Sequence, residues 1–436
     1  MPKRIENDGD AAARTNYASA QEAMKLLGIR QQTLYAYVSR GWIRSIRQPG
    51  QRNRLYLRED LERMSARSLA RSGHGAVAAS AMNWGEPIIP TTITEITAEG
   101  PRYRGKLACD LVRQGASFES VAELLWTGMW HEGAAWPQAE SSLELKRLTD
   151  SLPSLQASDQ LLEVFALVTL HLGVGRGTVA ERIRSGRTLD AARQVIHTLV
   201  GCCGLSSAAQ RYVAMRDGET VAQGLMRALG VKPTPENRRA IEAILILLAD
   251  HELSPGAFNA RVAASSGSTL HSCIASALCA SSGLEIGRLY NRVGEFLDSG
   301  RSKATLVARA LDFHRRNTMV PGFVHPMYPH GDPRARLLLE IARERDDPGR
   351  TLAPVFGFLE EVEERLSLHP RHEFAVAVLV RAMGLPRYAA GALFALARTA
   401  GWVAHVQEQR LSGSLLRPRA KFVGTSASAD ALPVIP

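Results

Sequence analysis

The sequence predicts a mainly α-helical protein in which a small basic module precedes a large, nearly neutral body. Apolar residues in the body recur at helical spacing, and alternating strand-like patterns are scarce. Charge also divides the chain: residues 1–72 hold 14 Lys and Arg against 7 Asp and Glu, a net charge of +7, whereas the other 364 residues carry only +3. A length of 436 residues is enough for roughly three structural units.

The composition excludes several classes of protein. Hydrophobic residues make up 45% of the chain, which argues against wholesale disorder, and apolar runs such as Phe374–Val380 fall far short of the ~20 residues of a membrane span. The first residues are polar and contain no apolar core, so no secretory signal is predicted. Five cysteines form no metal-ligand spacing, and we expect reduced thiols, a cytoplasmic location, no metal and no membrane partner. Buried packing of Cys202 and Cys203 is favoured over a redox pair.

Two short helices are expected at the start of the basic module, which we place at residues 16–64 after a polar tail at 1–15. Ser19 and Glu22 have the capping-box spacing, in which each side chain satisfies a free amide at the start of a helix. Apolar residues then recur at helical spacing as far as Gly28, and a second helix is predicted over residues 31–39. Two short helices joined by a tight turn form the helix-turn-helix pattern.

Two strand-like runs, residues 42–46 and 54–57, follow the second predicted helix. The Pro-Gly turn between them predicts a β-hairpin wing, and residues 19–64 resemble the winged helix-turn-helix of MerR-like DNA-binding proteins. Glutamine can read adenine edges, and Thr, Tyr and Arg can hold phosphates. A basic face that docks on protein, or a module that only aids dimerisation, is the alternative. The predicted DNA-contacting residues are Gln31, Gln32, Thr33, Tyr35 and Tyr37 on the second helix and Arg44, Arg47, Arg52 and Arg54 on the wing.

The body begins after a small, polar, Gly- and Ser-containing stretch at residues 65–82, which we predict to be a linker. A glycine-rich stretch at 173–177 looks like a phosphate loop, but it follows a helical pattern, so a plain helix end is the favoured interpretation. The clearest predicted helices of the body cover residues 107–112, 117–125, 160–172, 191–200, 238–248 and 373–383.

Two histidines and three arginines are the candidate binding residues of the body. Arginine forks bind carboxylates through two hydrogen bonds, and histidine can donate to a keto oxygen, so this set suits a small dicarboxylate. Taken singly, each histidine is more often a capping or core residue. The candidates are His251, His325, Arg334, Arg398 and Arg417.

The body resembles citrate synthase, an enzyme of the tricarboxylic acid cycle, from about Trp84 to Gly424. The resemblance is carried by YRG…DLVRQGASFESVAELLWTG, DHELSPGAFNARVAASSGSTLHSCIASAL, VPGFVHPMYPHGDPRAR, LFALARTAGWVAHVQEQ and RPRAKFVG, which follow in the family's order. It implies an all-α large domain at 83–280 and 399–436, a small domain at 281–398, and a homodimer. It also implies condensation of acetyl-CoA with oxaloacetate or a related 2-oxo acid, with CoA as a substrate or ligand and no tightly bound cofactor.

The resemblance assigns roles to individual residues. It maps the five candidates onto oxaloacetate-binding positions, with Arg417 reaching across the dimer interface and Ser254 standing where Asn is usual. His325 is also assigned to catalysis, together with Glu373 at the position of the family's basic Asp. The expected CoA region contains Pro321, Gly322 and Phe323.

The sequence departs from the family at positions that carry the chemistry. The family's GPxHGGA-type loop, whose His holds the thioester oxygen, corresponds here to residues 282–289, which contain no histidine. Glu373 is one methylene longer than Asp, and Val324 replaces a Gly before the site histidine. Unless Glu285 or Arg288 supplies the missing function, synthase activity is expected to be weak or lost. The alternative function is a DNA-binding transcriptional regulator that senses oxaloacetate, citrate or a CoA ester.

Overall fold

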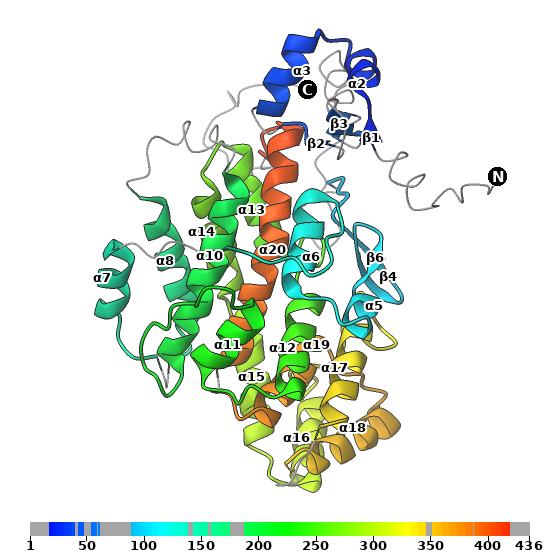
Figure 1. Ribbon diagram of the computed structural model, residues 1–436. Helices are drawn as coiled ribbons and strands as arrows, with labels where there is room; N and C mark the ends of the chain where they lie inside the picture. The colour runs from blue at the N-terminus through cyan, green and yellow to red at the C-terminus, as the bar shows by residue number, and fades with distance from the viewer. Residues whose placement is uncertain are drawn as a thin grey trace, which may run out of the picture.

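The structure is a computed structural model that describes residues 17–39, 42–47, 54–58, 60–61, 89–137, 143–155, 158–174, 187–345, 351–386 and 388–418. A small N-terminal module sits at one end of a long helical body (Figure 1). The mainly α-helical class expected from the sequence is confirmed.

The N-terminal module packs two helices on a three-stranded sheet. Helix α2 (Ala20–Leu27) begins with the expected capping box and ends at Gly28, whose φ of 63° is easily adopted by glycine. Helix α3 (Gln31–Ser39) occupies the predicted range. The strands pair antiparallel in the order β1-β3-β2, and the expected turn at 48–51, linker at 65–82 and tail at 1–15 lie outside the described residues. The strands are β1 (Tyr17–Ala18), β2 (Ser45–Arg47) and β3 (Arg54–Leu57).

The body opens with a small antiparallel sheet that the sequence patterns did not predict. Its strands, β4 (Thr94–Thr97), β5 (Gly100–Tyr103) and β6 (Lys106–Leu107), are too short to show a clear alternation. The helices of the first half include all of those predicted there. They are α5 (Ala108–Arg113), α6 (Phe118–Thr127), α7 (Leu143–Ser151), α8 (Leu161–Gly173), α10 (Thr188–Cys202), the 3₁₀-helix η1 (Cys203–Ser206), α11 (Val221–Leu229) and α12 (Pro235–Leu247).

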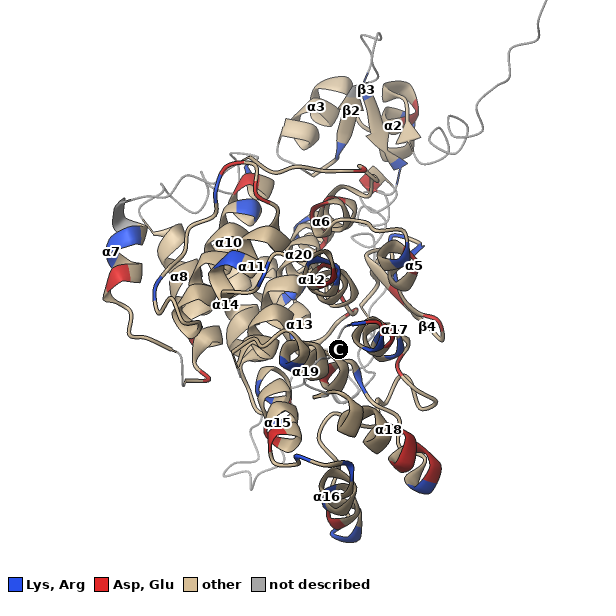
Figure 2. Ribbon diagram, turned by 60° about the horizontal axis from the view of Figure 1, so that its bottom comes forward, with Lys and Arg blue, Asp and Glu red and all other residues tan. Residues whose placement is uncertain are grey.

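The second half of the body is also helical, and the predicted helix near residue 373 is present as α19. Figure 2 shows charged residues on the peripheral helices α16 and α18, whereas α8 and α14 are almost entirely tan. The helices are α13 (Pro255–Ser265), α14 (Leu270–Ser281), α15 (Gly287–Asp298), α16 (Lys303–Arg315), α17 (Pro333–Arg343), α18 (Ala353–Leu366), α19 (His372–Ala382) and α20 (Ala389–Ser412).

Helix α20 is the central element of the body. It has 24 residues, most of them buried, and it packs against α6, α12, α13, α14 and α15. Gly401 lets it approach the end of α12, because a Cβ at this position would collide with the carboxylate of Asp250 and the carbonyl of Ala249. The Gly401 amide donates to the Ala249 carbonyl at 3.0 Å. This close approach brings the Arg398 side of α20 next to the Asp250-His251 segment.

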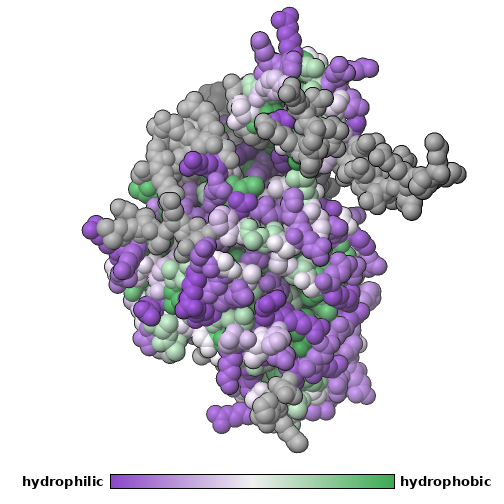
Figure 3. Space-filling view, in the orientation of Figure 1, coloured by the Kyte–Doolittle hydropathy of each residue, from purple (hydrophilic) through white to green (hydrophobic). Residues whose placement is uncertain are grey.

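The surface shown in Figure 3 is mostly hydrophilic, with scattered apolar side chains. Within the described ranges, none of the helices combines the length and apolar character that crossing a bilayer requires. The predicted burial of Cys202 and Cys203 is confirmed.

Candidate functional site

Four of the five candidate binding residues converge where α12, α17 and α20 approach one another. His251 follows α12, His325 lies in the loop before α17, and Arg334 and Arg398 project from α17 and α20. The rings of His251 and His325 lie 5.6 Å apart in an edge-on arrangement, and Arg334 Nη2 is 3.5 Å from His325 Nε2. The pKa of His251 is held well below its usual value by burial and by the nearby guanidinium groups of Arg334 and Arg398.

Arg334 is fully buried and fixed by Asp332, the N-cap residue of α17. Its Nε and Nη2 donate to the two carboxylate oxygens of Asp332 at 3.0 and 2.8 Å, and its own amide donates to Oδ1 at 3.0 Å. Although burial opposes ionisation, Arg334 keeps the pKa of Asp332 well below the usual value. Nη1 of Arg334 is buried and has no hydrogen-bond partner among the described residues. One edge of a rigid, charged fork therefore remains available to a carboxylate.

His325 is a neutral imidazole with a defined tautomer. Burial, followed by the Arg334 charge, lowers its pKa to about 3. Its Nδ1 accepts a hydrogen bond from the Met327 amide at 3.1 Å, so the single ring proton belongs on Nε2. The Tyr328 hydroxyl lies 3.5 Å from His251 Nε2 and closes the other side of the pair. His325 can thus present an N–H donor without carrying charge.

Arg398 is held by residues at the end of α12 and the start of α13. Its Nε donates to the Leu248 carbonyl at 2.7 Å, and its Nη1 donates to the Ser254 hydroxyl at 3.3 Å. Its guanidinium lies over the Phe394 ring, 5.1 Å from the ring centroid. Ser254 therefore acts as a support for the arginine.

Two residues beside the histidines have strained backbones. Glu252 follows His251 with a φ of 55°, and Val324 precedes His325 with a φ of 58°. Left-handed φ values are costly for a residue with a side chain, above all for a β-branched one, and they concentrate at functional sites. The Val324 amide donates to the His369 carbonyl at 3.1 Å, which helps to hold the turn.

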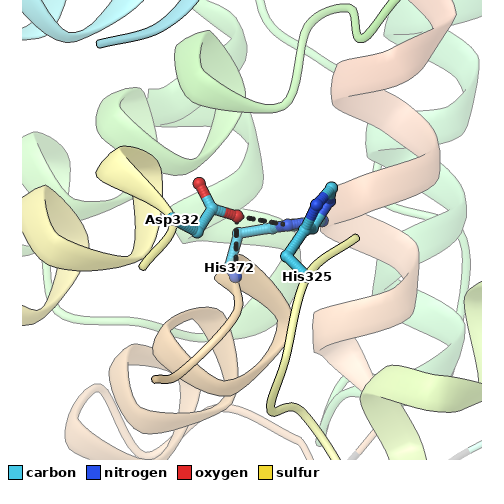
Figure 4. Close-up of side chains that lie close together, drawn as sticks. All are labelled: His325, Asp332 and His372. Carbon is cyan, nitrogen blue, oxygen red and sulfur yellow. Dashed lines mark hydrogen bonds and ion pairs between the residues drawn. The ribbon is translucent and has the colours of Figure 1, made fainter. Parts of the chain in front are cut away.

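The side chains of His325, Asp332 and His372 face one another and could be taken for three metal ligands (Figure 4). The same atom of Arg334, Nη2, lies 2.8 Å from Asp332 Oδ2, 2.9 Å from His372 Nδ1 and 3.5 Å from His325 Nε2. A metal ion among these three ligands would meet a buried guanidinium, which repels it. The donor set does not suit a metal, and Asp332 and His372 are better described as the frame that holds Arg334.

Glu373 is buried next to the cluster, but Arg371 neutralises it. Arg371 donates from Nε and Nη2 to the two oxygens of Glu373 at 3.0 and 2.6 Å. Burial alone would raise the pKa of Glu373, but the adjacent His372 and Arg371 outweigh burial and lower this pKa. A carboxylate held on both oxygens is a weak base.

The loop between α14 and α15 does not direct a charged group into the cluster. The Glu285 side chain is 86% exposed and lies 3.9 Å from Arg292. Arg288 forms ion pairs with Asp159 and Glu163 at 2.9 and 3.2 Å. The expectation that Glu285 or Arg288 supplies the missing donor stays a prediction; in this arrangement Glu285 faces solvent and Arg288 is paired with Asp159 and Glu163.

The remaining predicted ligand residues do not join the cluster. Arg417 is exposed, and its expected role across a dimer stays a prediction. Pro321, Gly322 and Phe323 are buried, and the Phe323 ring packs on Phe374 and Phe358 with centroids 5.0 and 5.9 Å away. A CoA group at this segment would have to contact its backbone or neighbouring residues.

The N-terminal module presents one polar face on α3. Gln31, Gln32 and Tyr35 are exposed, and Gln31 donates to the Tyr35 hydroxyl at 2.7 Å. Thr33 is partly exposed, whereas Tyr37 packs on Trp42 with ring centroids 5.2 Å apart. Tyr37 is thus partly a packing residue.

On the expected wing, Arg54 is exposed and donates to the Ser45 hydroxyl at 3.3 Å. Arg52 and the Arg47 side chain lie outside the described residues. The expectation for Arg44 needs correction, because its guanidinium points inward. It binds both carboxylate oxygens of the buried Asp60 and donates to the Trp126 carbonyl of the body at 3.3 Å.

Sequence reasoning missed Asp332 and His372, which hold Arg334 in place. A usable signal was present, since Asp-Pro is typical of a helix start and Asp332 is two residues before Arg334. His372 adjoins Glu373 and accepts or donates only after folding brings α19 to α17, so no local pattern marks it.

Similarity to known proteins extends over both parts of the chain. Residues 82–419 match the family model described as citrate synthase, C-terminal domain, and residues 19–68 match a helix-turn-helix domain. The chain is 26% identical over 366 residues to citrate synthase 2 of Bacillus subtilis, covering 78% of this chain and 95% of that protein. It is 28% identical over 351 residues to 2-methylcitrate synthase 2 of Corynebacterium glutamicum, covering 74% and 88%.

Solved structures show the same fold. Citrate synthase from Thermotoga maritima aligns with a TM-score of 0.67 at 23% identity, over 80% of this chain and 96% of that one. The ternary complex of carboxymethyl coenzyme A and oxaloacetate with citrate synthase from Thermoplasma acidophilum aligns with a TM-score of 0.68 at 21% identity, over 80% of this chain and 97% of that one. Both resemblances inferred from the sequence, to citrate synthase and to a helix-turn-helix, are confirmed.

Proposed function

The chain belongs to the citrate synthase family, and from this we propose that its body binds a 2-oxo dicarboxylate such as oxaloacetate, together with an acyl-CoA, and condenses them weakly or not at all. The observation that carries the proposal is the contrast within one cluster. Arg334 keeps Nη1 without a hydrogen-bond partner among the described residues, whereas both carboxylate oxygens of Glu373 accept hydrogen bonds from Arg371.

The binding half of the proposal follows from the buried cations. Arg334 and Arg398 each offer guanidinium hydrogen atoms to one carboxylate of the ligand, and the neutral His325 donates from Nε2 to the 2-oxo oxygen. An uncharged donor stabilises a carbonyl without adding a third positive charge, which suits a ligand with two negative charges.

The weakness of the condensation follows from the groups around Glu373. Condensation requires a base that removes a proton from the acyl methyl group and a donor that holds the enolate oxygen. Arg371 lowers the basicity of Glu373, and residues 282–289 provide no histidine. Removing one positioned oxygen donor costs roughly 100- to 1,000-fold in rate.

CoA release tests the enzymatic half of the proposal. Purified protein is incubated with oxaloacetate and acyl-CoAs of two and three carbons, since both citrate and 2-methylcitrate synthases are among the relatives. We expect slow release of CoA. Arg371→Gln should change the rate of this release more than the matched exposed variant Arg336→Gln does. Rapid turnover typical of an efficient synthase would overturn the proposal.

The family resemblance also supports a homodimer in which a small domain at 281–398 closes over a large domain. Arg417 would then reach the partner's site, and closure would exclude water from a reactive enol. Sedimentation of the full chain tests the assembly, and Arg417→Ala is expected to weaken oxaloacetate binding without changing the mass of the dimer.

The second candidate function is DNA-binding regulation by the N-terminal module, as a winged helix-turn-helix. It is favoured by the exposed Gln31, Gln32 and Tyr35 on one face of α3 and by the excess positive charge of residues 1–72. A two-fold dimer would suit a palindromic site.

Selection of genomic fragments by the full chain, with and without oxaloacetate, citrate or acetyl-CoA, tests this function. We expect enrichment of discrete sites that Gln31→Ala with Gln32→Ala abolishes while non-specific binding persists. Binding that shows no sequence preference at any salt concentration would argue for a protein-docking or dimerisation module instead.

A further inference from the structure

Tyr290 is a buried tyrosine on α15 whose ring contacts His372, a residue next to Arg334 of the candidate site. Its side chain is 1% exposed. Its ring stacks on Phe394 of α20 with centroids 5.1 Å apart, and it meets the His372 ring edge-on at 6.1 Å. Two elements that form the site therefore hold the ring in place.

The Tyr290 hydroxyl is buried without a hydrogen-bond partner in the described part of the chain. Buried hydroxyl groups nearly always find a partner, and leaving one unmade costs stability. Tyr103, an equally buried tyrosine, shows the ordinary case, since its hydroxyl lies 3.0 Å from the Ile246 carbonyl and 3.2 Å from that of Leu247. This contrast indicates that another molecule supplies the hydrogen-bond partner of the Tyr290 hydroxyl.

A second unpaired group flanks the same histidine. Arg334 Nη2 lies 2.9 Å from His372 Nδ1, and Arg334 Nη1 is buried without a partner among the described residues. Tyr290 and Arg334 therefore both contact His372, and each carries a buried donor atom without a hydrogen-bond partner among the described residues. One oxygen-rich ligand between them would satisfy both donors.

Charges from the site surround Tyr290. After burial, Glu373, Arg398, Arg334 and Arg371 are the groups that act on its pKa, which lies well above the usual value. The hydroxyl is consequently neutral and able to donate. The α14–α15 loop contributes no competing donor, because Glu285 is exposed and Arg288 pairs with Asp159 and Glu163.

We propose that the Tyr290 hydroxyl donates a hydrogen bond from α15 to a carbonyl oxygen of the bound ligand. The inference rests on the proposed binding function and names a residue for it. The carbonyl belongs either to the 2-oxo group of the dicarboxylate or to the thioester of the acyl-CoA.

Tyr290→Phe tests the inference because it removes the hydroxyl and keeps the ring. In the full chain, calorimetric affinities are measured for oxaloacetate against succinate, which lacks the 2-oxo oxygen, and for acetyl-CoA against S-ethyl-CoA, which lacks the thioester oxygen. We expect the variant to lose roughly tenfold in affinity for the carbonyl-containing member of one pair and to bind the other member as the parent does. The pair that responds identifies the carbonyl.

The melting temperature of the free protein separates a ligand-binding role from a structural one. Tyr290→Phe removes an unsatisfied hydroxyl, so the melting temperature is expected to stay the same or rise. Tyr103→Phe is the matched control. It leaves buried carbonyl groups without a hydrogen-bond donor and should lower the melting temperature by a few degrees.

Two results would overturn the inference, and they are distinguishable. In the first, the parent protein binds the carbonyl-containing member of a pair more tightly than its analogue, and Tyr290→Phe shows the same difference in affinity. Tyr290 is then not the donor, and the proposed binding function stands. If the parent binds none of the four compounds, both the proposed function and the role of Tyr290 are wrong.

Discussion

At the scale of single residues, we expect the geometry of Arg334 to determine what the site binds. Arg334→Lys keeps the positive charge beside Asp332 but replaces a planar fork by one ammonium group, which cannot hold Asp332 and a ligand carboxylate together. We expect oxaloacetate affinity to fall about 100-fold, as loss of roughly 2–3 kcal/mol of charge-assisted hydrogen bonding implies. Calorimetric titration measures it, with the exposed Arg336→Lys on the same helix as control. Equal affinities for the two variants would contradict the assignment of Arg334.

Val324 allows a test of backbone strain at the same scale. Its φ of 58° is unfavourable for a β-branched residue and ordinary for glycine. Val324→Gly is expected to raise the free energy of unfolding by about 1 kcal/mol, since relief of strain exceeds the added entropy of the unfolded chain. Denaturant unfolding measures the change.

The control for this variant is Val174→Gly, at an exposed valine with an ordinary φ of −79°, which should be destabilising. A Val324→Gly protein that is less stable than the parent would show that the turn is held without strain.

At the scale of elements, the junction of α6 and α12 contains a titrating carboxyl group. Glu242 on α12 accepts from the Phe118 amide at the start of α6, and burial, with the nearby Glu119 charge, raises its pKa to about 8. A raised pKa of an acid means that the folded state binds the extra proton, so stability falls as pH rises from about 4.5 to 8.

Glu242→Gln removes this titration while keeping an oxygen acceptor for the Phe118 amide. At pH 8 the variant is expected to be more stable than the parent by about 2–3 kcal/mol, allowing for the part of the side chain that faces water, and the difference should vanish near pH 4.5. Urea unfolding across this pH range measures it. The exposed Glu95→Gln should show no such pH dependence, and a constant difference for Glu242→Gln would exclude the proposed titration.

Local signals account for the elements that the sequence predicted. Helices α2 and α3 follow from the Ser19–Glu22 capping box, Gly28 and helical spacing, all of which act within a few residues. The strands of β4–β6 were missed because two to four residues cannot display alternation, and their pairing depends on neighbours in space.

The site was predictable in residue type but not in arrangement. The sequence offers His251, His325, Arg334 and Arg398 as suitable ligands for a dicarboxylate, yet their convergence depends on the packing of α20 against α12, which Gly401 permits. The inward orientation of Arg44 was likewise hidden, because its partners Asp60 and Trp126 are 16 and 82 residues away. Long-range partners of this kind leave no local pattern.

At the scale of the whole molecule, a continuous set of contacts joins the N-terminal module to the candidate site. Arg44 of the module donates to the Trp126 carbonyl at the end of α6. The Trp126 ring in turn donates from Nε1 to the Ala400 carbonyl at 2.9 Å, two residues beyond Arg398 on α20. We therefore expect a ligand bound at Arg398 to act on α20, the helix whose Ala400 carbonyl accepts from Trp126.

This arrangement predicts that ligand and DNA binding are coupled, and that two arginines of the module have different effects. Arg54 is exposed, so Arg54→Ala should weaken DNA binding to all sequences, reduce the salt slope by about one, and leave the response to oxaloacetate intact. Arg44→Lys keeps a positive charge next to Asp60 but loses the second contact to Trp126. We expect the Arg44→Lys variant to retain its affinity for DNA. It should lose most of the change in this affinity that oxaloacetate causes, a change that is typically 5- to 150-fold in coupled systems. Fluorescence anisotropy with a selected fragment, with and without oxaloacetate, measures both effects. If Arg44→Lys behaved like Arg54→Ala, Arg44 would be a DNA contact after all, and the path through Trp126 would carry no coupling.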